Sequence, residues 1–455
     1  MMIQHNEIEL ARHCIRFATE NGASAARLSL NKNVLDAYTI LNGELDKVSH
    51  SADRSIYLYL FVNNRYGTFS TNRLDKEGLE DFIRKAIVMV GMLGEDECRR
   101  LPSPQRTAKD AQTGLELGLC DPGYEEFSSE QRLERARSMS RFNSMAPTET
   151  YAVISEECEY AESSDDTLLI DSQGFEGRHR ETSFNCFTEI TIQDKEGNRY
   201  SGYWWEASPR RAELQTEGCS SKALERATGQ IGPKSRRSGR YKMVIDSTVA
   251  SRLVSPVLNA LNASAIQQKM SFLEGSKDQK LFPEGLTICD LARTPGKAGS
   301  RLYDSEGVAT ADRAIIENGV VKEYFVNTYL AGKTRFSPTV EDISRPCLTP
   351  FIKDKKLADG EKTVSLEDIL RICGNGIYVT GFNGGNCNPV TGDFSFGIEG
   401  FAFKQGKVVH PVKEMLITGN IMTLWNSLIA AGSDARPSSR WQIPSLAFDD
   451  VSFSA

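Results

Sequence analysis

The spacing of apolar residues predicts a helix followed by strands at the start of the chain. Over residues 7–21, apolar positions recur at three- and four-residue intervals, and the Asn-Gly pair that follows is a typical helix stop. Over residues 38–69 the pattern changes to β-rich runs, and Asn42-Gly43 between two of them is a strong hairpin signal. Residues 74–93 return to the helical period. We therefore expect a helix packed against an antiparallel meander.

The middle of the chain reads as a connection followed by a second block of strands. Residues 96–127 carry several prolines and glycines, which predicts a long surface connection. Ser128 and Gln131 form the pattern of a capping box, so a helix is expected to begin there. Strand patterns interrupted by turn sequences then cover residues 151–214, and residues 220–228 read as a short helix.

The second half mixes helices and hairpins in the same way. A strand is predicted over 241–245, followed by a helix with Ser255 as N-cap and Pro256 as its first residue. Two hairpins are predicted next, with turns at Asn318-Gly319 and Gln405-Gly406. A last long helix is predicted from the N-cap Asn420 through Ile429, with Gly432 as its stop.

Because helices and hairpins come in blocks, the pattern favours an α+β fold over a doubly wound sheet. We expect two halves, each built of antiparallel, hairpin-rich, curved sheets with packed helices. The basic, polar stretch 234–242 suggests a boundary, giving an N-terminal α+β domain over 1–235 and a C-terminal β-rich domain over 236–455. Both halves contain an Asn-Gly hairpin, which suggests a duplicated scaffold.

The overall composition and charge argue against some classes of function. The 455 residues are 40% hydrophobic and 25% charged, which is ordinary for a globular protein. The 54 basic and 61 acidic residues give a formal charge of −7, so binding to a nucleic acid backbone has no general electrostatic support. The basic stretch 234–242 is therefore more readily a solvated linker than a nucleic acid contact. The start of the chain shows no secretory pattern and no run is long enough to span a bilayer, so we expect a cytoplasmic protein without a membrane segment.

Cysteine and histidine positions limit the chemistry further. The ten cysteines are dispersed, with no CxxC pair, and the five histidines include no HExxH or HExxxH spacing. Two local alternatives remain open. Cys387 with His410 could form a nucleophilic pair, although cysteines in such a sequence are more often buried free thiols. Asp304, Glu306 and Asp393 could act in acid–base chemistry, although acidic residues in β-rich loops more often cap turns.

Several sequence blocks carry a family resemblance. The run NPVTGDFSFG at 388–397, the following EGFAFKQGKVVHPVKEMLITGN at 399–420, and YDSEGVATADRAIIENGVVKEYFVNTYLAGK at 303–333 resemble the TldD/PmbA family. Members of this family have been called modulators of DNA gyrase and peptidase family U62. The N-terminal NGELDKVS and YGTFSTNRL also fit, so the resemblance covers nearly the whole chain.

The resemblance distinguishes two kinds of subunit. TldD-type subunits are similar to zinc peptidases, with an HExxxH helix and a C-terminal cysteine as ligands. Here the corresponding helix reads SPVLNALNAS from Ser255, with Asn259 and Asn262 as its amides, and no cysteine follows Asp434. Carboxamides are poor zinc ligands. The resemblance is therefore to the PmbA/TldE type, with no metal ligands and no catalytic residues assigned in this chain.

This resemblance implies a role in a complex. PmbA/TldE-type proteins are the non-metal half of a peptidase that processes or degrades unfolded peptides, with zinc in a TldD-type paralogous partner. A homodimer of the isolated chain is also compatible with paralogous subunits. Candidate peptide-binding or cavity-lining residues are Trp204, Trp205, Asn259, Asn262, Asn388, Thr391 and Asp393. At least one of the two tryptophans is more readily a core residue, and Asn388, Thr391 and Asp393 more readily fix the turn after Pro389.

Two other functions remain as alternatives. The chain could be a self-sufficient metallopeptidase with dispersed ligands such as His179 and His410. It could instead be a regulatory module associated with gyrase or DNA, which the acidic balance disfavours.

Overall fold

The computed structural model describes residues 2–353 and 363–455 of the chain. Contacts divide the chain into two compact units. The first consists of residues 1–227, 293–310 and 327–341, and the second of residues 228–292, 311–326 and 342–455. The chain therefore returns twice to the first unit after entering the second. The domain boundary at 235/236 stays a prediction.

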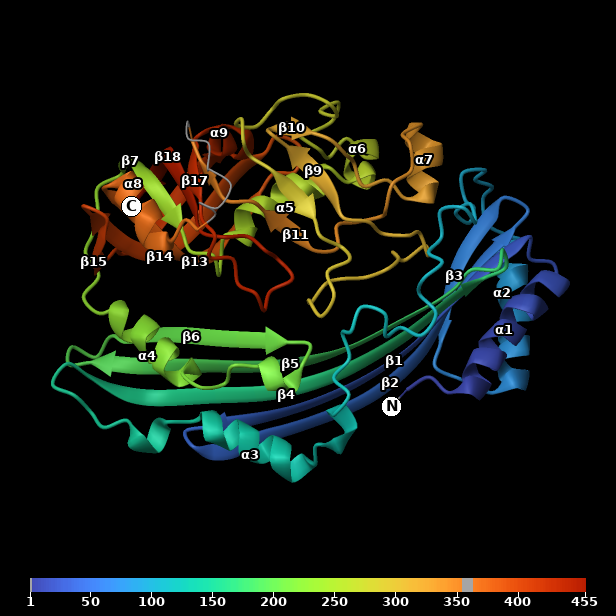
Figure 1. Ribbon diagram of the computed structural model, residues 1–455, viewed down its shortest axis with the longest axis horizontal. Helices are drawn as coiled ribbons and strands as arrows, with labels where there is room; N and C mark the ends of the chain where they lie inside the picture. The colour runs from blue at the N-terminus through green and yellow to red at the C-terminus, as the bar shows by residue number, and fades with distance from the viewer. Residues whose placement is uncertain (1, 354–362) are drawn as a thin grey trace. The chain divides into compact units, whose positions relative to one another are not determined.

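The first unit is built on one antiparallel sheet of very long strands, which bends along its length (Figure 1). Its strand order is β3-β2-β1-β4-β5-β6. The strands are β1 (Ala25–Leu41), β2 (Glu44–Val62), β3 (Arg65–Thr71), β4 (Tyr151–Asp171), β5 (Glu176–Asp194) and β6 (Arg199–Ser208).

Two short turns connect the first three strands, and the one at Asn42-Gly43 was predicted. Asn42 and Gly43 have φ of 52° and 84°, and Asn63 and Asn64 have φ of 47° and 59°. Two successive residues in the left-handed region form the hairpin turn that matches the twist of the flanking strands. Asparagine and glycine tolerate this backbone better than other residues, so these turns fix the register of β1, β2 and β3.

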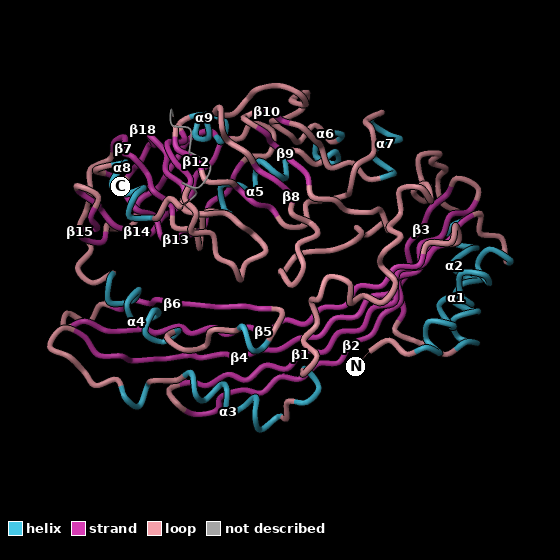
Figure 2. The backbone as a smooth tube through the Cα atoms, viewed as in Figure 1, coloured by secondary structure: helices cyan, strands magenta, loops and turns pink. Residues whose placement is uncertain are grey.

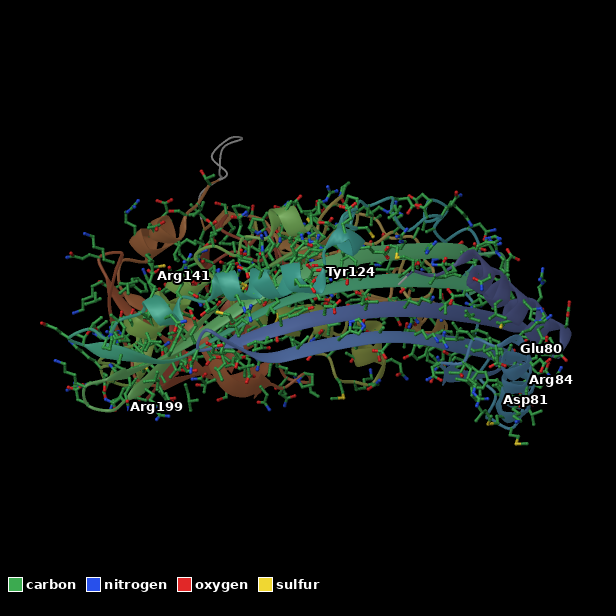
Figure 3. All side chains as sticks on the ribbon, turned by 90° about the horizontal axis from the view of Figure 1, so that it is seen from below. Glu80, Asp81, Arg84, Tyr124, Arg141 and Arg199 are labelled. Atoms are coloured by element: carbon green, nitrogen blue, oxygen red, sulfur yellow. The ribbon has the colours of Figure 1, made fainter. Side chains whose placement is uncertain are left out.

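Helices cover one face of this sheet. They are α1 (His5–Glu20), α2 (Lys76–Val90), α3 (Ser129–Met139) and α4 (Cys219–Gly229). The first unit also contains α7 (Thr328–Thr334) and the short 3-10 turns η1 (Tyr124–Glu126), η2 (Phe142–Ser144) and η3 (Arg211–Glu213). The helices α1 and α2 bury their apolar faces against β1 and β2, while Asp81 and Arg84 are exposed on α2 and Glu80 faces His13 of α1 (Figure 3). The predicted capping box of Ser128 and Gln131 is present at the start of α3.

Residues 96–127 form the predicted long connection, and much of it is exposed, but several of its apolar residues are buried. Leu101, Leu117 and Leu119 are all less than 8% exposed. Leu117 and Leu119 pack with Phe175 and Tyr303 in a separate small core. Prolines and glycines mark irregular backbone, but they do not show whether a loop packs beneath other segments.

The second unit contains a closed circuit of strands. β7, β13, β14, β16 and β18 form a ring, because β18 pairs with β7 as well as with β16. The strands of this unit are β7 (Gly239–Ile245), β8 (Ile288–Asp290), β9 (Arg313–Glu317), β10 (Val320–Val321), β11 (Pro346–Leu348), β12 (Phe351–Ile352), β13 (Gly376–Cys387), β14 (Asp393–Lys404), β15 (Lys407–Pro411), β16 (Met415–Asn420), β17 (Leu428–Ala431) and β18 (Leu446–Ser454).

Among the described residues, a smaller sheet and four helices complete the second unit. The smaller sheet has the order β10-β9-β8-β11, and long loops lead into and out of β8 (Figure 2). The predicted turns Asn318-Gly319 and Gln405-Gly406 are both present with positive φ. The helices are α5 (Ser251–Ala260), α6 (Ala263–Gln267), α8 (Leu366–Cys373) and α9 (Ile421–Asn426).

Two helix predictions in this unit are wrong in their extent. The helix that begins after Asn420 ends at Asn426, and Leu428–Ala431 form strand β17. The helix predicted to begin at Pro256 begins at Ser251, so the proline lies inside α5. A short apolar run such as 428–431 fits a helix face and a buried strand equally well, and only its pairing with β18 decides.

The predicted fold class is confirmed: the chain is α+β, with antiparallel, hairpin-rich sheets and packed helices. The two units differ in strand order, and duplication of one scaffold stays a prediction. No helix among the described residues is both long and apolar enough to cross a membrane.

Candidate functional site

The helix α5 presents an apolar face to the core and a polar face outward. Val254, Val257 and Leu258 are fully or almost fully buried. On the other side, Asn259 is exposed and its amide nitrogen lies 3.4 Å from the Ser255 hydroxyl oxygen one turn earlier. The polar face of this helix thus offers a hydroxyl and a carboxamide.

Asn262 ends the connection between α5 and α6 and caps the second helix. Its side-chain oxygen accepts a hydrogen bond of 2.9 Å from the Ser264 backbone N–H. The neighbouring residues are tied to a strand-like segment, since Ala263 N–H donates to the Phe325 carbonyl at 2.9 Å. This oxygen therefore serves as a helix cap.

The turn from Asn388 to Asp393 is held by its own polar side chains. The Asn388 side-chain oxygen accepts from Val390 N–H at 2.9 Å, and the Thr391 hydroxyl donates to the Asp393 carboxylate at 2.7 Å. Asn420 adds a contact from outside the turn: its amide donates to the Thr391 carbonyl at 2.8 Å and to the Asp393 carboxylate at 2.9 Å. The sequence identified Asn420 only as a helix cap, a role that its bond to Met422 N–H confirms.

The titratable groups of this turn show no activated nucleophile. Hydrogen bonds from Asn420 and Thr391 lower the pKa of Asp393 from its ordinary value. Burial raises the pKa of the Cys387 thiol. At neutral pH the carboxylate is therefore ionised and the thiol protonated, which suits a structural turn better than covalent catalysis.

The turn and the helix α5 belong to neighbouring segments of the second unit. Arg252 on α5 donates to the Gly385 carbonyl at 3.1 Å, and its guanidinium lies 5.2 Å from the centroid of the Phe396 ring. The Phe272 N–H, beyond α6, donates to the Pro389 carbonyl at 3.1 Å. The structure thus brings two sequence-predicted groups, the asparagines of α5–α6 and the 388–393 turn, onto adjoining segments.

A hollow of about 200 Å³ lies beside the same turn. It is lined by Arg240, Phe394, Thr418, Gly419, Asn420, Thr423, Leu424, Ser427, Asp450, Val451 and Ser452. Arg240 and Asp450 form an ion pair across it, and both side chains are more than half exposed. Asn420 connects this hollow to the 388–393 turn.

The donors at α5 do not fit a catalytic zinc ion. Zinc takes thiolate, imidazole or carboxylate ligands, whereas Ser255, Asn259 and Asn262 offer a hydroxyl and two amides, one of them engaged as a cap. Across residues 2–353 and 363–455, no three His, Cys, Asp or Glu side chains are grouped to hold a metal. His179 and His410 belong to different units.

The two tryptophans of β6 point to opposite faces of the first sheet. Trp204 packs against the core beside α3, donates its ring N–H to Glu206 at 2.8 Å, and contacts the cations of Lys222 and Arg226. Trp205 lies opposite Phe187 of β5 on the other face, and both are half-buried. These residues belong to the first unit, whereas the asparagines and the 388–393 turn belong to the second.

The carboxylates of Asp304 and Glu306 are buried and serve the backbone. Asp304 accepts hydrogen bonds from the N–H groups of Glu306, Val308 and Glu341. Glu306 accepts from both the N–H and the hydroxyl of Thr328, at 2.8 Å each. Burial raises the pKa of each carboxyl group. These hydrogen bonds connect segment 293–310 to segment 327–341 within the first unit. The two carboxylates therefore stabilise turns and backbone, the structural alternative of the sequence analysis, and the acid–base alternative has no support here.

Three family models match successive parts of the chain. They are PmbA/TldA metallopeptidase domain 1 at residues 28–90, the central domain at 123–231 and the C-terminal domain at 238–455. The crystal structure of a proposed modulator of DNA gyrase from Bacteroides thetaiotaomicron is 37% identical, covers 100% of both chains and has a TM-score of 0.91. The chain belongs to the PmbA/TldD family.

Other members of the PmbA/TldD family share the fold at lower identity. The crystal structure of TldE from Thermococcus kodakarensis is 18% identical, covers 98% of this chain and 100% of that one, and has a TM-score of 0.79. Among curated proteins, Metalloprotease PmbA of Escherichia coli O157:H7 is 22% identical over 446 residues, covering 94% of this chain and 92% of its own. A PmbA homologue of Haemophilus influenzae is 24% identical over 470 residues, covering 97% of this chain and 94% of its own.

Proposed function

We propose that this chain is a PmbA/TldE-type subunit that holds no catalytic metal and works in a two-subunit cytoplasmic metallopeptidase. In this proposal the zinc ion is held by a TldD-type paralogous subunit, and the complex processes or degrades unfolded peptides. Membership of the PmbA/TldD family supports the peptidase connection. The name TldE of one structural neighbour supports the subunit type.

The observation that carries the proposal is the donor set of α5 and α6. A hydrolytic zinc site needs three strong ligands and an open position for water. The polar face of α5 presents Ser255 and Asn259 instead, and the Asn262 oxygen already caps α6. In the proposed complex, this chain shapes the peptide-binding cavity and the partner supplies the hydrolytic centre.

Peptide contact is assigned to groups that suit an extended chain. Exposed carboxamides can hydrogen-bond a peptide backbone, and aromatic rings can hold its side chains. Asn259, Asn388 and Thr391 are the polar candidates in the second unit, with Asp393 as the charged one. Trp205 is the better aromatic candidate of the first unit, since Trp204 is packed against the core.

Metal content and activity together test the proposal. The purified chain is expected to hold much less than one zinc per chain and to cleave no unfolded casein. Co-expression with a TldD-type subunit should yield a complex with about one zinc per pair and with chelator-sensitive cleavage. Stoichiometric zinc in the isolated chain, or cleavage by the partner alone at the full rate of the mixture, would refute the proposal.

The two alternatives give different results in the same assays. A self-sufficient metallopeptidase would lose both metal and activity in His410→Ala, whereas the proposed subunit is unaffected. A DNA-associated module would bind duplex DNA with an affinity that falls steeply with salt, as phosphate contacts require. The formal charge of −7 disfavours this second result.

A further inference from the structure

The structure brings cysteines together in both units, in two different ways. In the first unit, the sulfur atoms of Cys186 and Cys219 lie 3.6 Å apart, and each residue is 1% exposed. In the second unit, Cys289 of β8 lies directly opposite Cys347 of β11, and both are half-buried. All four are free thiols. The first pair is in closer contact, whereas the second pair can be reached from solvent.

The strands β8 and β11 place the second pair on one face of the small sheet. The opposite face belongs to the core, where Ile288 and Leu348 are at most 2% exposed. Side chains alternate between the two faces of a sheet, so Cys289 and Cys347 point together to the other face. On β9, the residue beside Cys289 is Ala314, which is also half-buried. Its small side chain leaves the cysteine pair uncovered on this side.

The backbone holds Cys289 and Cys347 at a separation that a disulfide can span. Thr349 N–H donates to the Thr287 carbonyl at 3.1 Å, and Leu291 N–H donates to the Arg345 carbonyl at 2.9 Å. The register between these two bonds is regular, and the cysteine pair lies halfway between them. Hydrogen-bonded pairs alternate along antiparallel strands, so the cysteines form such a pair, with about 5.5 Å between their Cα atoms. Disulfides join Cα atoms about 4.4–6.8 Å apart.

A buried cation without a partner lies beside Cys347. Arg345 is 5% exposed, and its guanidinium makes no hydrogen bond or ion pair with any residue of the ranges 2–353 and 363–455. A buried guanidinium without a counter-ion is costly. Burial lowers the pKa of Arg345, and the negative charges that oppose this are those of the Cys347 thiolate and, more weakly, Asp312. The guanidinium is therefore placed to stabilise a thiolate at Cys347.

The two thiols of this pair differ in their electrostatic surroundings. Burial raises the pKa of both. The Arg345 guanidinium counteracts this effect for the pKa of Cys347, whereas carboxylates such as Glu317 raise the pKa of Cys289 further. The thiolate is the nucleophile in thiol chemistry. Cys347 is therefore the better attacking group of the two.

We infer that Cys289 and Cys347 form a reversible dithiol site for low-molecular-weight disulfides, in which Cys347 attacks first and Arg345 stabilises its thiolate. The Cys347 thiolate attacks one sulfur of the small disulfide, which forms a mixed disulfide and releases one small thiolate. Cys289 then loses its proton to solvent and attacks the Cys347 sulfur, and the second small thiolate leaves. Two protein thiols are thus oxidised to one disulfide, while the small disulfide is reduced to two thiols.

The product has a defined place in the fold. β11 is the edge strand of the small sheet, and the disulfide fastens it covalently to β8. The inference concerns the isolated chain and does not depend on the proposed peptidase role.

Cys186 and Cys219 provide a comparison within the same molecule. Their thiols are hydrogen-bonded to each other, and both approach the Gln215 carbonyl, at 3.7 Å and 3.6 Å. The hydrogen bond with Cys219, together with burial, raises the pKa of Cys186. Buried, protonated thiols are inert toward exchange. Exposure and the nearby cation, rather than the distance between sulfur atoms, should therefore decide which pair is oxidised.

Disulfide mapping tests the site. The reduced, folded chain is incubated with hydroxyethyl disulfide, the remaining thiols are alkylated, and the peptides are analysed by mass spectrometry. We expect a Cys289–Cys347 bond that dithiothreitol reverses, while Cys186 and Cys219 stay free. Absence of this bond, or oxidation of Cys186 and Cys219 at an equal or higher rate, would overturn the inference.

Single cysteine variants test the order of attack. Cys289→Ser should stop at a mixed disulfide on Cys347, formed at close to the wild-type rate of the first step. Cys347→Ser should form a mixed disulfide on Cys289 at least about tenfold more slowly, because this thiol has carboxylates and no cation beside it. Equal rates in the two variants would contradict the assigned order.

Variants of Arg345 test the role of the cation. Arg345→Met should slow the first step by at least about fivefold, and Arg345→Lys, which keeps the charge, should recover most of the rate. Arg237→Met removes an exposed arginine of the same unit and is the matched control, with no change expected. An unchanged rate in Arg345→Met, or equal slowing in Arg345→Lys, would show that the guanidinium does not stabilise the thiolate.

Circular dichroism identifies any variant that fails to fold. If Arg345→Met is unfolded, the two cysteine variants still decide, because they leave the guanidinium in place.

Discussion

The two units stabilise their interiors in different ways. Along the helix-covered face of the first sheet, β4 places Glu156, Glu162 and Asp166, all at most 1% exposed. The second unit instead buries large apolar side chains such as Trp425, Phe448 and Phe453. A buried carboxylate is tolerated only with close donors, whereas an apolar core needs only shape and volume. Removing one side chain of a buried polar pair in the first unit should therefore lower the free energy of unfolding more than reducing one apolar side chain in the second unit.

Glu162 is the most demanding of these buried charges. Its carboxylate accepts from Arg132 at 2.8 Å, from Arg211 at 3.0 Å and from the Tyr160 hydroxyl at 2.5 Å. Two arginines from different segments thus meet on one acid. The ion pairs hold α3 and the η3 turn against β4.

The largest expected effect is therefore that of Glu162→Ala. Removing this acid leaves two largely buried guanidinium groups with backbone acceptors but no counter-ion, which costs about 3–5 kcal/mol in the free energy of unfolding. Urea unfolding monitored by circular dichroism measures the change. The exposed Glu149→Ala is the control and should stay within about 0.5 kcal/mol. A loss below about 1 kcal/mol for Glu162→Ala would show that the contrast between the units is wrong.

Trp425→Phe tests the apolar side of the comparison. Trp425 is fully buried, and its ring N–H donates to the Leu253 carbonyl at 3.2 Å. Its ring packs edge-on against the Phe448 ring, with 5.6 Å between the two ring centroids. The smaller ring leaves a void and an acceptor without its donor, so we expect a loss of about 2 kcal/mol in urea. This loss should be independent of salt. A loss as large as that of Glu162→Ala would remove the distinction between the two interiors.

Asn420→Ala should have a smaller effect at the surface of the second unit. The change removes the cap of α9 and both bonds to the 388–393 turn. We expect a loss of about 1 kcal/mol, as for other N-cap substitutions. Thermal unfolding provides the measurement, and Asn420→Ser should recover part of the loss because serine can still cap. Equal loss in both variants would mean that the turn contacts, not the cap, matter.

The smallest effect concerns pH. Burial raises the pKa of Glu306 in the folded state, so this group favours folding below its ordinary pKa, and that contribution is lost as the pH rises through the folded pKa. Glu306→Gln should therefore flatten the decline in stability that begins above the ordinary range of a glutamate. Unfolding free energies at a series of pH values would show it. An unchanged slope would mean that Glu306 does not contribute to the decline.

Local signals were enough for the hairpins, and long-range contacts explain the errors. Asn42-Gly43 and Asn318-Gly319 determine their turns by backbone preference alone, so the sequence predicts them. The partners of Glu162 are 30 and 49 residues away, and nothing local to β4 shows that its acids face the core. The same limit applies to residues 428–431, whose strand character depends on β18.

In the candidate site, too, the local contacts could be predicted from the sequence and the long-range contacts could not. The composition of the Asn388–Asp393 turn indicated its structural reading, which its hydrogen bonds match. The contact from Asn420 was not visible, because it joins residues 27 and 29 positions apart. For Asn259 and the two tryptophans, peptide binding remains a prediction.

The interleaving of the two units bears on how the protein is made. Segments 293–310 and 327–341 belong to the first unit, although the chain has by then entered the second. During synthesis, the first unit is therefore completed only by segments that begin 85 or more residues after the end of β6, and the faces that these segments cover are exposed in the meantime. Such non-local closure is slow and exposes a nascent chain to aggregation. Folding of this protein on the ribosome should consequently depend on chaperones more than its modest size would suggest.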